Sequence, residues 1–277
     1  MNRIARLPVL SAALVATMIS MTGCNRLNAR MELNKGVAAY KAGKPETAIN
    51  HFQEAVKDEP GLPMAKLYLA TALAGTVVPG LDSADNIKIA QRAVSTYQEV
   101  LADDPNDVSS LKGIAGLYFT IKKLPEAKEW QKRVLAVDPK DPEAAYTIGV
   151  IDWTLAHENA LNLLRPAGLN DDGMGNVKMP KKVCADIQEK NAPLVEEGLK
   201  YLNMAVQNRA NYDDAMAYIN LIYHRKADVD CGNEAARKED VAAADAWREK
   251  AMGARKANQA AKEKPGGITL DANGKMK

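Results

Sequence analysis

The sequence predicts an all-α protein built as a solenoid of about five helix pairs. Apolar residues recur at helical spacing, as in Ile114, Leu117 and Ile121. Pro105 and Pro139 lie 34 residues apart, and prolines separate the helical stretches. A small residue, an alanine and a proline recur at steps of twelve residues: Gly36, Ala48 and Pro60, then Ala115, Ala127 and Pro139. This recurrence indicates stacked helix pairs, in which each pair buries its apolar face against its neighbours.

Five units follow one another along the chain. The first three span about residues 29–62, 63–107 and 108–141. The fourth and fifth, about 142–211 and 212–262, are longer, and Ala210 stands where a proline is expected. Residues 263–277 contain Pro265-Gly266-Gly267, which interrupts the helical pattern, so we expect a flexible C-terminal tail.

The recurring residues resemble the tetratricopeptide repeat family at that family's spacing. In the first unit the matching residues are Gly36, Gly43, Ala48, Phe52, Ala55 and Pro60. In the third unit they are Ile114, Ala115, Tyr118, Ala127, Val134 and Pro139. The resemblance covers most of residues 29–262 and is weakest in the last two units. It implies a right-handed α-solenoid whose first helices line a concave groove for peptides or partner helices.

Three of the units carry insertions between their two helices. The distance from the small residue to the next marker is 12 residues in units one and three, but 23, 49 and 24 residues in units two, four and five. We expect the inserted stretches Val77–Ile87, Glu158–Pro193 and Ala227–Lys238 to emerge along one edge and form a functional rim. The alternative is tolerated loop growth, which costs little free energy.

The N-terminus has the features of a bacterial lipoprotein signal. Arg3 and Arg6 precede 17 uncharged residues, and Met21-Thr22-Gly23-Cys24 is similar to a lipobox. Resemblance to bacterial lipoproteins implies cleavage after residue 23, lipidation of Cys24, including an acyl chain such as palmitate, and a short linker over residues 24–28. Each buried methylene of an acyl chain contributes roughly 0.8 kcal/mol to membrane attachment. An uncleaved membrane anchor is the alternative, because 17 residues are at the lower limit for a span.

Charge and motifs argue against nucleic-acid binding and catalysis. Without residues 1–23 the chain has 35 basic and 35 acidic residues and no basic run, whereas nucleic acid requires clustered cations. His51, His157 and His224 lie in helical stretches without a neighbouring nucleophile motif. Asp171 and Asp172 lie beside Gly173 and are interpreted as turn residues. We therefore expect no enzyme activity, no metal and no cofactor.

Two further cysteines, Cys184 and Cys231, remain in the oxidising compartment that an export signal predicts. Cys184 precedes the second helix of unit four, and Cys231 follows the first helix of unit five. Antiparallel helices joined near Asn211 would bring both thiols to one end, so we expect a disulfide that closes a loop of 47 residues. Two unpaired thiols are the alternative, and zinc is disfavoured because neither cysteine has a second ligand nearby in sequence.

The resemblance also implies which residues face the groove. The candidates for partner binding are Tyr40, Phe119, Tyr146, Trp153, His224, Lys112 and Arg225. Most are aromatic or imidazole side chains in a chain with 5% Phe, Trp and Tyr. Packing in the core is the alternative interpretation of such a stripe.

These observations favour an adaptor rather than an enzyme. The expected function is a membrane-anchored periplasmic scaffold that binds proteins or peptides of the cell envelope in its groove. A lipoprotein that binds a small ligand or glycan at the insertion rim is the alternative. Asn25 after the lipidated cysteine favours outer-membrane sorting, under the rule known from enteric bacteria.

Overall fold

The computed structural model describes residues 25–263, which are mostly α-helical and contain no strand. The prediction of an all-α fold is confirmed for these residues. The chain divides into two compact units, each larger than one of the five repeats: unit 1 extends to Trp130 and unit 2 starts at Gln131. The expected signal peptide, the lipidation site Cys24 and most of the expected tail lie outside the described residues.

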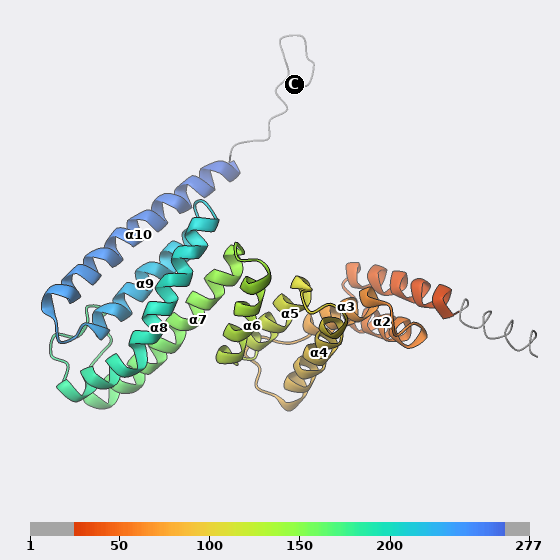
Figure 1. Ribbon diagram of the computed structural model, residues 1–277, viewed down its shortest axis with the longest axis horizontal. Coiled ribbons are helices and arrows are strands. Elements are labelled where there is room, and N and C mark those ends of the chain that lie inside the picture. The colour runs from red at the N-terminus through yellow and green to blue at the C-terminus, as the bar shows by residue number, and fades with distance from the viewer. Residues whose placement is uncertain (1–24, 264–277) are drawn as a thin grey trace, which may run out of the picture. The chain divides into compact units, whose positions relative to one another are not determined.

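Unit 1 consists of short helices that pack in chain order (Figure 1). The helix over residues 25–41, which includes most of the expected linker, precedes α2 (Pro45–Asp58), α3 (Pro63–Ala74), α4 (Ala84–Asp103) and α5 (Val108–Thr120). Next, α6 (Leu124–Val137) runs across the boundary between the units. Prolines start α2 and α3, where a missing N–H costs no helical hydrogen bond. Asp107 caps α5 by accepting a hydrogen bond from the backbone N–H of Ser110 at 2.7 Å.

The small residue of the first repeat has the packing role that the repeat pattern predicts. Gly36 faces the ring of Phe52, which is 2% exposed, and a Cβ atom at position 36 would overlap that ring. The two helices of the pair therefore approach at a point where only a glycine fits.

Unit 2 consists of longer helices, α7 (Pro142–Leu164), α8 (Lys181–Asn208), α9 (Asp213–Val229) and α10 (Glu234–Glu263), with the 3₁₀ turn η1 (Arg165–Ala167) after α7. Helices adjacent in sequence pack side by side, and α7 also packs against α9 (Figure 1). The main core lies among α7, α8 and α9 and includes Ala145, Val195, Leu202, Ile219 and Ile222.

The inserted residues differ from the expected rim of loops. In unit 2 they mostly lengthen helices, because α7 has 23 residues, α8 has 28 and α10 has 30. Only residues 168–180 and 230–233 are left as connections outside the helices and η1. The extension has a core of its own, formed by Ala160, Leu164 and Ile187. Pro193 lies inside α8, whereas prolines were expected at helix ends.

The insertion in the second repeat is ordered by one side chain. Asn86, which is 4% exposed, accepts a hydrogen bond from the N–H of Val78 and donates to the carbonyls of Val78 and Leu81. These bonds satisfy the backbone N–H of Val78 and the carbonyls of Val78 and Leu81 in the 75–83 connection. Among residues 25–263, no helix combines the length and the apolar composition that crossing a membrane requires.

Candidate partner-binding site

Unit 1 contains a largely apolar cavity of about 380 Å³. The helix over 25–41, α2, α3 and the start of α5 contribute its lining: Val37, Tyr40, Lys41, Phe52, Leu67, Tyr68, Thr71 and Ser109. All but Phe52 belong to first helices of their repeats, which is the face predicted to bind partners. The volume falls within the range of natural ligand pockets.

The walls of this cavity are fixed by contacts among its own side chains. The rings of Phe52 and Tyr68 pack at 5.7 Å between centroids, tilted by 49°. The hydroxyl of Thr71 donates to the carbonyl of Leu67 at 2.8 Å and lies 3.2 Å from the hydroxyl of Tyr97. Burial, the main influence, raises the pKa of Tyr97, so this hydroxyl stays protonated at neutral pH.

The predicted groove residues of unit 1 lie in different surroundings. Tyr40 lines the cavity and is 44% exposed, so its ring is available to a partner. Lys41 borders the same cavity and provides a positive charge beside it. Phe119 is exposed near the end of α5, and Lys112 is exposed near its start, but neither lines the cavity.

Two predicted residues of unit 2, Tyr146 and Trp153, belong to an aromatic array along α7 and α9. Trp153 stacks on His157 at 5.1 Å and meets Tyr218 edge to face at 5.4 Å. Tyr146 also meets Tyr218 edge to face, at 5.6 Å, and packs on Tyr212 at 5.1 Å. The rings are half-buried or buried, so the alternative of packing accounts for part of the stripe.

The N-terminal end of this array is held by charge. Arg209 lies over the ring of Tyr212 at 4.3 Å and pairs with Glu143 at 2.5 Å. The hydroxyl of Tyr212 donates to Glu143 at 2.9 Å. Burial first, and then this bond, raises the pKa of Tyr212, while burial raises that of Tyr146 to about 12. The ring hydroxyls therefore remain neutral hydrogen-bonding groups.

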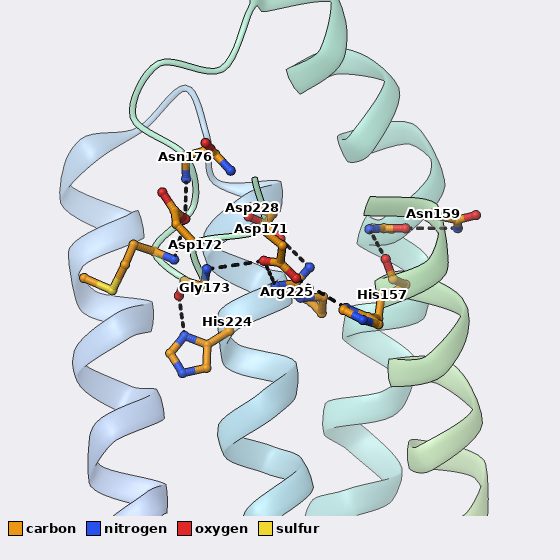
Figure 2. Close-up of polar contacts among 12 residues, drawn as sticks. His157, Asn159, Asp171, Asp172, Gly173, Asn176, His224, Arg225 and Asp228 are labelled. Atoms are coloured by element: carbon orange, nitrogen blue, oxygen red, sulfur yellow. Dashed lines mark hydrogen bonds and ion pairs between the residues drawn. The ribbon is translucent and has the colours of Figure 1, made fainter. Parts of the chain in front are cut away.

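The opposite end of the array meets residues 168–180, the connection between η1 and α8, which we call the strap. His224 donates a hydrogen bond from Nδ1 to the carbonyl of Gly173, and Arg225 donates to Asp171 at 2.6 Å (Figure 2). His157 reaches Asp171 from α7, with 3.4 Å between Nδ1 and Oδ2. Both predicted partner-binding side chains of α9 are thus engaged by the chain itself, and Arg225 is 3% exposed.

Two carboxylates near Arg225 have opposite pKa shifts. Burial opposes ionisation of Asp171, but the hydrogen bond and charge of Arg225 outweigh it and lower the pKa. Burial raises the pKa of Asp228 to about 7, although Arg225 favours its ionised form. Arg225 Nη1 lies 3.0 Å from Asp228, yet neither carboxylate oxygen has a hydrogen-bond partner among the described residues. The ion pair therefore lacks hydrogen-bonding geometry, which explains why desolvation dominates at Asp228.

The expected disulfide between Cys184 and Cys231 is present, with 5.9 Å between the Cα atoms. The turn interpretation of the acidic pair is also confirmed. Asp171 accepts from the N–H of Gly173, and Asp172 accepts from that of Met174 at 2.8 Å.

Sequence reasoning missed several residues that complete these sites. Tyr68, Thr71 and Ser109 line the cavity, but they were not among the residues predicted to face the groove. Tyr68 and Thr71 lie about one helical turn apart on α3, close to Leu67, which also lines the cavity. A search of the whole face of this helix would therefore have found them. No sequence signal pairs Asp171 with Arg225, because the strap has no repeat period.

Comparisons with known proteins agree with this fold. Tetratricopeptide repeat family models match residues 33–76 and 90–149. The chain therefore contains tetratricopeptide repeats, and repeats of this class act as scaffolds for protein interactions.

Solved structures of MamA resemble the chain. MamA 41-end from Desulfovibrio magneticus RS-1 aligns with 18% identity and a TM-score of 0.55, covering 83% of this chain and 96% of that one. A MamA RS-1 double mutant aligns with 18% identity and a TM-score of 0.56, covering 84% of this chain and 97% of that one. A further MamA crystal structure aligns with 14% identity and a TM-score of 0.55, covering 87% of this chain and 98% of that one. At these identities the likeness shows the fold alone. The comparison with curated proteins returned no match.

Proposed function

We propose that the protein is a non-enzymatic, lipid-anchored scaffold that faces the periplasm and binds an extended segment of an envelope protein in the unit 1 cavity. One observation carries the proposal: the cavity opens on the first helices of the repeats, with Tyr40 exposed in its wall. The lipobox at Cys24 supports attachment to a membrane, and Asn25 supports the outer one.

The cavity also defines the ligand chemistry. Phe52, Leu67 and Tyr68 provide an apolar surface for one bulky side chain of the bound segment. Lys41 at the border favours a carboxylate beside that side chain. The preferred segment therefore carries an apolar residue followed or preceded by an acidic one.

Site-specific crosslinking tests this proposal. Tyr40 would be replaced by a photoreactive phenylalanine analogue in the full-length protein, and crosslinked envelope proteins would be identified by mass spectrometry. Met64 provides the matched control, because it is 44% exposed on α3 but does not line the cavity. We expect a discrete crosslinked partner from position 40 and none from position 64. Equal products from both positions, or none from position 40, would contradict the proposal.

A second candidate function rests on a cavity in unit 2. This cavity has a volume of about 360 Å³ and lies between α8 and α9. Its lining consists of Ala192, Val195, Glu196, Leu199, Lys226, Val229 and Asp230. Part of this lining belongs to the inserted residues, as the small-ligand alternative requires. Native mass spectrometry of the purified protein would reveal a retained small molecule, and its loss in a Val195→Trp variant would place it here.

A further inference from the structure

The strap contacts two of the positions of unit 2 that the repeat pattern assigns to the binding face, His224 and Arg225. His224 stands at the groove position of α9, and His157 lies one helical turn beyond the groove position of α7. Both are in contact with the strap, His224 through the carbonyl of Gly173 and His157 through Asp171 (Figure 2). The chain thus places its own segment where a partner of the last two repeats would lie.

The strap also lies tightly against α9 and α10. Arg237, in the first turn of α10, donates from Nη1 to the carbonyl of Met174 at 2.6 Å. A Cβ atom at Gly175 would overlap the carbonyl of Ala227 and the side chain of Arg237. In these hydrogen bonds the strap therefore provides the acceptors, which are main-chain carbonyls and one carboxylate. Side chains of α9 and α10 provide the donors.

A disulfide closes this arrangement at the end of the strap. Cys184 lies in the first turn of α8, four residues after the strap, and Cys231 lies between α9 and α10. The bond therefore joins the C-terminal end of the strap to the helices that the strap covers. Both cysteines are partly exposed, so a reductant can reach them.

We propose that the last two repeats hold a second site, for an acidic peptide segment, which the strap occupies and which reduction of the Cys184–Cys231 disulfide by a dithiol uncovers. The dithiol supplies two electrons and two protons, becomes a cyclic disulfide and leaves two thiols on the protein. The ligand class follows from the donors left behind: Arg225 binds a carboxylate, and His224 and Arg237 bind main-chain carbonyls. This site is separate from the unit 1 cavity, so each can fail without the other.

Histidine labelling tests whether the disulfide holds the strap in place. The full-length protein would be acylated with diethyl pyrocarbonate before and after treatment with dithiothreitol, and each histidine would be followed by mass spectrometry. We expect labelling of His224 to accelerate at least tenfold on reduction, while His51 of unit 1 stays unchanged. A Cys184→Ser/Cys231→Ser double variant should match the reduced protein and ignore the reductant. Equal rates at His224 in the oxidised and reduced protein would overturn the role of the disulfide.

A peptide copied from the strap tests the ligand class. A fluorescent peptide of residues 169–176, Leu-Asn-Asp-Asp-Gly-Met-Gly-Asn, would be titrated into oxidised and reduced protein. We expect at least tenfold tighter binding to the reduced form, and loss of that binding when the first aspartate of the peptide is replaced by asparagine. No binding to reduced protein, or equal binding of both peptides, would overturn the acidic-peptide assignment. Retained circular dichroism would establish that the reduced protein is folded.

Discussion

Arg225 and Asp171 form an ion pair of 2.6 Å although 54 residues separate them in sequence. The guanidinium is 4% exposed and the carboxylate 17%, so the pair is shielded from water on one side. It joins α9 to the strap, two elements that no repeat pattern connects. Several properties of unit 2 depend on this pair and on its neighbour Asp228.

Replacing Asp171 with asparagine should destabilise unit 2 by about 1 kcal/mol at pH 7, since removing one partner leaves Arg225 with less compensation, while partial exposure screens the loss. The folded-state pKa of Asp171 lies below 3.8, so its contribution is present above that pH and is lost as the pH falls through the lowered value. Urea unfolding at pH 7 and pH 3 measures both effects. Asp172→Asn is the control, because an amide oxygen can still accept from Met174; equal losses in the two variants would contradict the role of the ion pair.

Asp228→Asn should stabilise the protein at high pH. The pKa of Asp228 rises from 3.8 unfolded to about 7 folded, so the native state holds a proton more strongly and loses stability as the pH rises from about 4 to 7. The variant should be more stable than the native protein at pH 8, on the order of 2 kcal/mol, and should differ little near pH 4. Thermal unfolding at the two pH values provides the measurement. If the native protein instead became more stable than the variant as the pH rises, the ionised form of Asp228 would be the one that stabilises the fold.

Two glycines on α5 should respond oppositely to alanine. A Cβ atom at Gly113 would overlap the ring of Tyr97, so Gly113→Ala should cost about 1–3 kcal/mol through overpacking. Gly116 has no atom within 4 Å of an added Cβ, so Gly116→Ala should stabilise the helix by up to about 1 kcal/mol. Denaturant midpoints of the two variants give the comparison. Similar effects of the same sign would show that the packing between α4 and α5 is looser than described.

Cys24→Ser tests the proposed anchor. If Cys24 is lipidated, the variant should leave the membrane fraction and lose incorporation of labelled palmitate, because serine offers no thiol to which the diacylglyceryl group can be attached as a thioether. Fractionation and metabolic labelling measure both. Asn25→Asp is the companion variant, expected to retain the label but shift between inner and outer membranes. Persistence of the palmitate label in Cys24→Ser would rule out this residue as the site.

The repeats were predictable because their signals are local and periodic. Gly36 and Phe52 are separated by a fixed number of residues, and the need for close helix contact dictates both. The helix extensions of unit 2 could not be predicted, because the distance between repeat markers gives the length of an insertion but not its structure. Pro193 added to the error, since a proline inside a helix resembles a proline at its end.

The candidate sites were predictable only in part. Tyr40 follows from the repeat pattern and does line the cavity. The burial of Arg225 could not be foreseen, because its partner Asp171 lies in a strap whose path depends on the packing of four helices. A charge beside a predicted groove looks the same in sequence whether it meets a partner or the protein itself.

The position of the disulfide also sets an order of events during synthesis. A chain that emerges N-terminus first exposes Cys184 well before residue 231 exists, so the extension of unit 2 closes only after α9 is complete. Three thiols allow three pairings, two of them incorrect. Under the proposed lipidation, Cys24 is already a thioether by then, and the oxidising machinery meets a chain with one possible intramolecular bond.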